Sequence, residues 1–126
     1  MAIVAMLAIF GMSFGMSFGG ASAFAQSEMT WQMKTTRGDK IEIAFFSQDR
    51  KGFRWPAQGR VYTLTDDDEV RKFKIACLGG EKICYGAWVS GRPSTSWGMG
   101  QDGKRSCQNC CYTCNGNETR IIALGY

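Results

Sequence analysis

Apolar and polar side chains alternate with a period of two along most of the chain after residue 26, and a 3.6-residue period is not seen. The clearest segment runs from Thr30 to Thr35, where Trp31 and Met33 stand between polar neighbours. Alternation of this kind, with many β-branched and aromatic residues between turn signals, is typical of half-buried strands. We therefore expect strands at residues 30–35, 41–46, 60–64, 70–78, 83–90 and 120–124.

Glycine, proline and acidic residues mark the connections between these segments. Gly79 and Gly80 predict a hairpin turn, and Pro56 restricts residues 53–56 to an edge strand or an irregular piece because it has no backbone N–H. Residues 91–105 are rich in Gly and Ser and are expected to form a long loop. About five to seven short strands without a helix predict an all-β fold, a small antiparallel β-sandwich or open barrel.

The first 25 residues carry no charged side chain and contain a compact apolar run at residues 2–10. Small residues alternate over 21–25, which fits the A-x-A rule for cleavage of a secretory signal. We expect a signal peptide at 1–25 that is cleaved after Ala25, leaving a single disulfide-rich β-domain at 26–126 with no stable membrane span. The alternative is an uncleaved anchor, in which the Gly-x-x-x-Gly series at residues 11–19 packs against another helix.

Composition narrows the range of functions. The formal net charge is only +4, which does not indicate nucleic-acid binding. The chain contains no histidine, so the commonest general base and the commonest zinc ligand are both missing. We therefore expect a protein that is not an enzyme and that has no cofactor.

Six cysteines dominate the second half of the chain, and four of them fall between residues 107 and 114. In an exported protein, periplasmic or secreted, such a cluster is expected to form structural disulfides. A bridge between the adjacent Cys110 and Cys111 needs a strained ring. Two arrangements remain open, one that pairs Cys77 with Cys84 across the hairpin and a favoured one in which both reach the cluster. The candidate structural disulfide residues are Cys77, Cys84, Cys107, Cys110, Cys111 and Cys114.

Two other functions of the cysteines compete with disulfide bonding. A thiolate site for zinc or copper could use Cys107, Cys110, Cys111 and Cys114, although the two CxxC pairs abut instead of standing a dozen or more residues apart. A thiol–disulfide oxidoreductase could use Cys107 and Cys110, but such motifs need a helix N-terminus to lower the thiol pKa.

A ligand-binding surface is the leading functional hypothesis. Residues 50–60 interleave cations with aromatics, and Arg54, Trp55 and Arg60 are the candidate contacts, joined by Trp97 from a glycine-rich segment. Exposed aromatic rings with arginines could hold an anionic glycan or an anionic envelope surface. The same residues also fit a solvated loop whose Trp55 packs back onto the core. The sequence thus predicts an exported binding or structural module.

Overall fold

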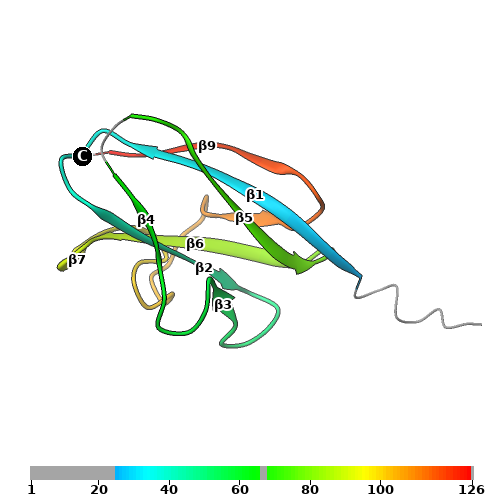
Figure 1. The fold of residues 1–126 in the computed structure, drawn as a ribbon. Coiled ribbons are helices and arrows are strands. Elements are labelled where there is room, and N and C mark those ends of the chain that lie inside the picture. The colour runs from blue at the N-terminus through cyan, green and yellow to red at the C-terminus, as the bar shows by residue number, and fades with distance from the viewer. Residues whose placement is uncertain (1–24, 66–67, 126) are drawn as a thin grey trace, which may run out of the picture.

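The computed structural model describes residues 25–65 and 68–125, which form an all-β domain of nine strands in two sheets (Figure 1). Apart from Ala25, the expected signal peptide lies outside the described residues. The strands are β1 Gln26–Thr35, β2 Ile41–Ser47, β3 Arg54–Trp55, β4 Tyr62–Leu64, β5 Arg71–Leu78, β6 Lys82–Val89, β7 Arg92–Gly98, β8 Cys111–Thr113 and β9 Glu118–Leu124.

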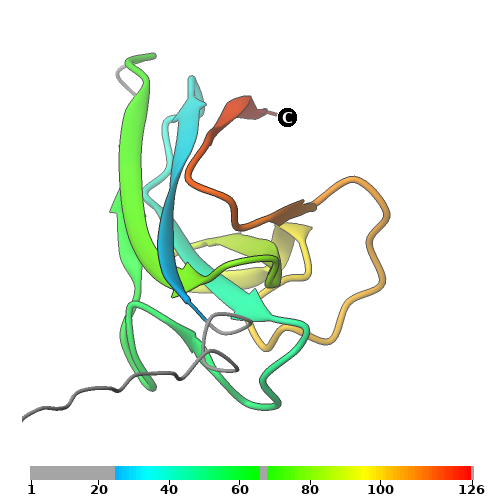
Figure 2. The ribbon, with the colours of Figure 1, turned by 90° about the vertical axis from the view of Figure 1, so that its right-hand side faces the viewer.

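The two sheets differ in size. The smaller has the order β5-β1-β9, and the larger has the order β3-β2-β6-β7, with β4 added to β2 and β8 added to β6. Two short strands therefore share each outer edge of the β2–β6 pair: β3 and β4 lie along β2, and β7 and β8 lie along β6. Figure 2 shows the connection from β7 to β8 projecting from this edge.

The alternation in the sequence produces the core between the sheets. Along β1 the side chains from Met29 to Thr35 are buried at every second position, so one face of the strand meets the other sheet. The central contact joins Trp31 of β1 to Phe45 of β2, whose ring centroids are 4.6 Å apart in a stacked arrangement. Both side chains are fully buried, and aromatic pairs of this kind add to the stabilisation from burial.

One strand pairing differs from the antiparallel fold that the sequence predicts. Strand β9 pairs with β1 in parallel, and the register runs from Gln32 opposite Ile121 to Thr35 opposite Leu124. A register shift separates this ladder from Thr30, and the Gln32 side chain donates to the carbonyl of Thr119 at 2.7 Å across it. The alternation of apolar and polar side chains is the same in parallel and antiparallel strands. The sequence pattern therefore could not predict the parallel direction of β9.

The prediction of a loop at residues 91–105 is wrong for the first half of this segment, which forms a strand. Residues Arg92–Gly98 form β7, which pairs with β6 through a register shift between Trp88 and Val89. The segment has low strand propensity, but the open edge of β6 supplies hydrogen-bond partners for its backbone. The part that remains irregular, residues 99–110, passes across the outer face of the larger sheet, where a Cβ atom on Gly86 would lie 2.1 Å from the Gly100 carbonyl oxygen.

The outer face of the smaller sheet carries exposed ion pairs. Lys74 lies 2.9 Å from Glu28, and Lys72 lies 3.1 Å from Glu118. Alternating charges of this kind suit a solvated face and form no large patch of one sign. Within residues 25–65 and 68–125 no helix is both long and apolar enough to cross a bilayer.

Candidate ligand-binding cleft

Three disulfides hold the C-terminal third of the domain to its sheets. Cys77 of β5 pairs with Cys114, and Cys84 of β6 pairs with Cys111 of β8. The third disulfide, Cys107–Cys110, closes a short loop just before β8. Both hairpin cysteines thus reach the cluster and one bridge lies within it, which is the arrangement that the sequence favours.

The pairing leaves no thiolate for the alternative metal site. Every cysteine of the sequence is in a disulfide. Among the described residues the one group of possible soft-metal ligands is Cys84, Cys110 and Cys111, and all three are oxidised. The oxidoreductase hypothesis also lacks support from local structure, because Cys107–Cys110 is followed by β8 instead of by a helix.

A hollow lies at the end of β2, on the side of the larger sheet that faces away from the core. It is a cleft of about 740 Å³ between the β2–β3 turn and residues 99–104. The second wall is fixed by backbone bonds, since the Met99 N–H donates to the Tyr85 carbonyl at 2.9 Å and the Arg105 N–H donates to the Met99 carbonyl at 3.1 Å. Clefts of this size hold ligands as large as a short oligosaccharide.

A buried carboxylate anchors the first wall. Glu81 is almost fully buried, and its two oxygens accept from the Arg50 guanidinium at 2.7 and 2.9 Å. The Ser47 hydroxyl and the Leu78 N–H also donate to it. Burial alone raises the pKa of Glu81, but these hydrogen bonds outweigh it and hold the pKa below its ordinary value. The β2–β3 turn is therefore tied to the β5–β6 turn.

Arg54 and Phe46 form the base of the cleft. The Arg54 guanidinium carbon lies 5.1 Å from the centroid of the Phe46 ring, a cation–π distance. The ring also packs against Gly103, where an added Cβ atom would lie 2.8 Å from a ring carbon. The Arg54 Nε atom is buried and has no acceptor among the described residues, and one Nη atom makes a long bond of 3.4 Å to the Arg60 carbonyl. The described residues thus use little of the donor capacity of Arg54.

Phe53 gives the cleft an apolar face. It is 41% exposed, although it lies edge-on to the buried Trp55 ring with 5.0 Å between the centroids. The Arg50 guanidinium covers one side of the Phe53 ring at 3.8 Å and is itself held by Glu81. The orientation of this exposed ring is therefore set by a partly buried ion pair.

Charged and amide groups surround these aromatics. Lys51 and Lys104 join Arg54 as cations, against the carboxylates of Asp49 and Asp102. Both carboxylates already accept backbone N–H groups, from Lys82 at 2.8 Å and from Lys104 at 3.2 Å. Gln48 and Gln58 add side-chain amides. The cleft combines a small excess of positive charge with groups that can hydrogen-bond to hydroxyls.

The structure separates the four residues of the predicted binding surface. Trp55 is only 7% exposed and belongs to the core, which is the second of the two arrangements that the sequence allows, so it is not available as an exposed stacking ring. Its indole fills the space between the two sheets because β3 sits at the edge of the larger one. Arg54 lines the cleft, whereas Arg60 is exposed beside a separate shallow hollow.

Trp97 lies far across the larger sheet from Arg54, because β2 and β6 stand between β7 and β3. The Trp97 ring is half-buried, donates from Nε1 to the Gly125 carbonyl at 3.2 Å, and has the Arg37 guanidinium 5.5 Å from its centroid. The structure therefore does not bring Trp97 into the binding surface.

Sequence reasoning missed Phe46 as an aromatic ring of the cleft, whereas Phe53 belongs to the segment 50–60 that it singled out. A signal for Phe46 exists, because consecutive residues of a strand face opposite sides and the buried Phe45 leaves Phe46 on the outer face. Nothing comparable points to residues 99–104, which reach the cleft through the path of a long connection.

No protein-family model, no curated protein and no solved structure matches this chain. The fold and the disulfides define the chain as a small disulfide-bonded all-β domain. Multiple disulfides suggest an oxidising, extracytoplasmic environment.

Proposed function

We propose that this domain is an exported, non-enzymatic binding module, periplasmic or secreted, that holds an anionic glycan in the cleft between the β2–β3 turn and residues 99–104. The observation that carries the proposal is the Arg54 guanidinium, which lines the cleft and makes one long hydrogen bond, of 3.4 Å to the Arg60 carbonyl. A carboxylate or sulfate is the acceptor that a guanidinium binds most strongly, through charge-assisted hydrogen bonds.

The aromatic rings support a sugar as the remainder of the ligand. Phe53 exposes an apolar surface next to Arg54, and pyranose rings bury their C–H groups against such surfaces. The Gln48 and Gln58 amides are suited to hydroxyl groups. Lys51 and Lys104 add attraction for a second acidic unit along a short chain.

The carboxylates of the cleft have structural partners, which supports binding over hydrolysis. Asp49 accepts the Lys82 N–H and Asp102 accepts the Lys104 N–H, so both are engaged in shaping turns. Glycoside hydrolysis uses a pair of carboxyl groups, and both carboxylates that line the cleft hold backbone N–H groups of turns.

Calorimetric titration with an oligogalacturonate and with its neutral methyl ester tests the proposal. We expect the acidic oligosaccharide to bind and the ester to bind at least about tenfold more weakly, because a charge-assisted hydrogen bond contributes about 1.5–3 kcal/mol. Arg54→Gln should weaken binding by a similar factor. Lys72→Gln, which removes a cation from the far sheet, is the matched control and should bind normally.

Two results contradict the proposal. One is equal affinity for the acidic and neutral oligosaccharides, which means that charge is not recognised. The other is unchanged affinity in Arg54→Gln, which places the ligand elsewhere on the domain.

A further inference from the structure

The longest connection that the structure describes in full joins β7 to β8. It comprises residues 99–110, whereas the β2–β3 and β3–β4 connections comprise residues 48–53 and 56–61. Seven of its residues from 101 to 109 are exposed, and the other two are partly exposed. Exposed loops of this kind are preferred sites of proteolytic cleavage.

Two adjacent cations, Lys104 and Arg105, lie on the exposed surface of this connection. Trypsin-like proteases place one Lys or Arg side chain in a pocket that contains an aspartate. The Arg105 guanidinium already donates to the Ser96 carbonyl at 2.9 Å and to the Ser96 hydroxyl. The exposed Lys104 side chain is therefore the one that enters such a pocket without breaking these bonds.

The backbone around Lys104 is held by exposed hydrogen bonds. The Arg105 N–H donates to the Met99 carbonyl at 3.1 Å, and the Lys104 N–H donates to the Asp102 carboxylate at 3.2 Å. Water replaces the partners of exposed hydrogen bonds at small cost. The segment can therefore open locally, as a protease requires, while the two sheets stay intact.

Both ends of the connection are fixed to β6. The Met99 N–H donates to the Tyr85 carbonyl at 2.9 Å, and the Tyr85 N–H donates to the Cys110 carbonyl at 3.0 Å. Between these points Gly103 packs on the partly exposed Phe46 ring. Local opening therefore involves the residues between the two fixed ends and does not extend into the strands.

The other exposed cations of the described residues lie on shorter connections or within strands. Lys51 follows Arg50, whose guanidinium is bound to the buried Glu81, and the Phe53 N–H closes this turn on the Arg50 carbonyl at 3.0 Å. Arg60 lies in the β3–β4 connection, which is half as long as the β7–β8 connection. A protease is therefore expected to cut first beside Lys104.

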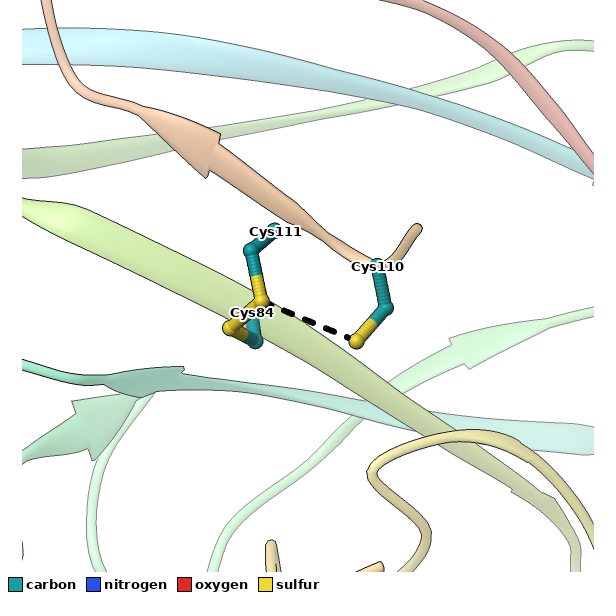
Figure 3. Close-up of side chains that lie close together, drawn as sticks. All are labelled: Cys84, Cys110 and Cys111. Atoms are coloured by element: carbon teal, nitrogen blue, oxygen red, sulfur yellow. Dashed lines mark hydrogen bonds between the residues drawn. A yellow bond between two sulfur atoms is a disulfide. The ribbon is translucent and has the colours of Figure 1, made fainter. Parts of the chain in front are cut away.

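Two disulfides join the parts of the chain that precede and follow this connection. Cys77–Cys114 and Cys84–Cys111 each link a strand before residue 99 to a residue after 110, and Figure 3 shows the second of them between β6 and β8. Strand β9 also pairs with β1. A cut beside Lys104 therefore leaves two chains that stay covalently bonded.

We propose that the Lys104–Arg105 peptide bond is a processing site for trypsin-like proteases, and that cleavage gives a two-chain domain held by two disulfides. The C–N bond between the residues breaks, and water supplies a hydroxyl group to the Lys104 carbonyl carbon and a proton to the Arg105 nitrogen. No disulfide is broken. Residues 99–104 stay attached to β7 but lose their link to β8, so one wall of the cleft becomes a free chain end.

Limited digestion of the native full chain with trypsin, without reductant, tests this site. We expect a first product that is heavier by one water, stays one species on a non-reducing gel, and gives two fragments after reduction, with a new N-terminus at Arg105. Lys104→Gln should slow the loss of intact chain at least about tenfold, because the protease pocket loses its cation. Arg60→Gln, at an exposed residue of the β3–β4 connection, is the matched control and should be cut at the native rate.

First cleavage at any other bond, including the one after Arg105, overturns the proposal. So does resistance of the native chain at trypsin concentrations that digest the reduced and unfolded chain. Separation of the fragments before reduction also overturns it, because no disulfide then crosses the cut. The nicked protein should keep the circular dichroism spectrum of the native protein, and loss of that spectrum shows that a two-chain domain does not persist.

Discussion

The indole Nε1 of Trp55 donates a hydrogen bond of 2.7 Å to the carbonyl oxygen of Ala76. Trp55 belongs to β3 at the edge of the larger sheet, and Ala76 belongs to β5 at the edge of the smaller one. This single bond therefore closes one side of the sandwich. The exposed Phe53 ring packs on Trp55. The position of this part of the cleft wall therefore depends on the contact between the two sheets.

Trp55→Ala should lower the free energy of unfolding by about 3 kcal/mol, since it removes a large core side chain and the bond to Ala76. Phe53→Ala, two residues away and largely exposed on one side, should lower it by about 1 kcal/mol or less. Urea unfolding followed by fluorescence or circular dichroism measures both. Equal losses in the two variants contradict the assignment of Trp55 to the core.

The disulfides should contribute unequally to stability. The Cys77–Cys114 bridge spans a sequence separation of 37, and the Cys107–Cys110 bridge spans 3. In the chain-entropy model, removing the first as a double alanine variant lowers the free energy of unfolding by about 4 kcal/mol, and removing the second lowers it by about 2 kcal/mol. Urea titrations of the two double variants, compared with the native protein, provide the measurement. The reverse order is the result that the structure does not allow.

The free energy of unfolding should fall in acid because Glu81 becomes protonated. The pKa of Glu81 is held below its ordinary value of 4.5 in the folded protein. Because the unfolded chain binds this proton more readily, the contribution is complete above about pH 5 and is lost as the pH falls through the lowered folded pKa.

Glu81→Gln tests this dependence. The variant should lose about 2 kcal/mol at pH 7, where the native carboxylate accepts from Arg50 and Ser47, and less at pH 2 to 3. Glu118→Gln, at an exposed ion pair, serves as the control and should change stability little at either pH. A loss in Glu81→Gln that is the same at all pH values shows that the charge of Glu81 does not contribute.

Gly103→Ala should lower the free energy of unfolding by more than its backbone strain alone accounts for. Gly103 has a φ of +73°, and an added Cβ atom meets the Phe46 ring at 2.8 Å. Gly91 in the β6–β7 turn has a φ of +83° with nothing within 4 Å, so Gly91→Ala reports the strain alone, about 1 kcal/mol. We expect Gly103→Ala to exceed this value, to shift the Phe46 ring resonances in NMR spectra, and to weaken ligand binding. Identical behaviour of the two variants contradicts the packing of residue 103 on Phe46.

Side-chain periodicity and turn residues were enough to predict the fold class. The buried positions of β1 follow the alternation around Trp31 and Met33, and the turn at Gly79 and Gly80 separates β5 from β6. These features are local, because the side-chain period of a strand and the preference of glycine for tight turns depend on a few residues.

The remainder depends on contacts between distant segments. The parallel direction of β9 and the strand at residues 92–98 are set by which sheet edges stay open, which local propensity does not encode. Of the predicted binding residues, Arg54 lines the cleft. The position of Trp55 could not be predicted, because a tryptophan among cations fits both a surface and a core. Phe46 faces the cleft only because residues 99–104 return to cover it.

The parallel β1–β9 ladder limits when the smaller sheet can form during synthesis of the chain. Its two strands come from opposite ends of the described chain, so the smaller sheet gains its third strand only after residue 124 has been synthesised. The Cys77–Cys114 and Cys84–Cys111 bridges likewise await residues 111–114. Contacts of such long sequence separation form slowly. The sandwich therefore cannot close until residue 124 has left the ribosome, after all eight of the other described strands have been made.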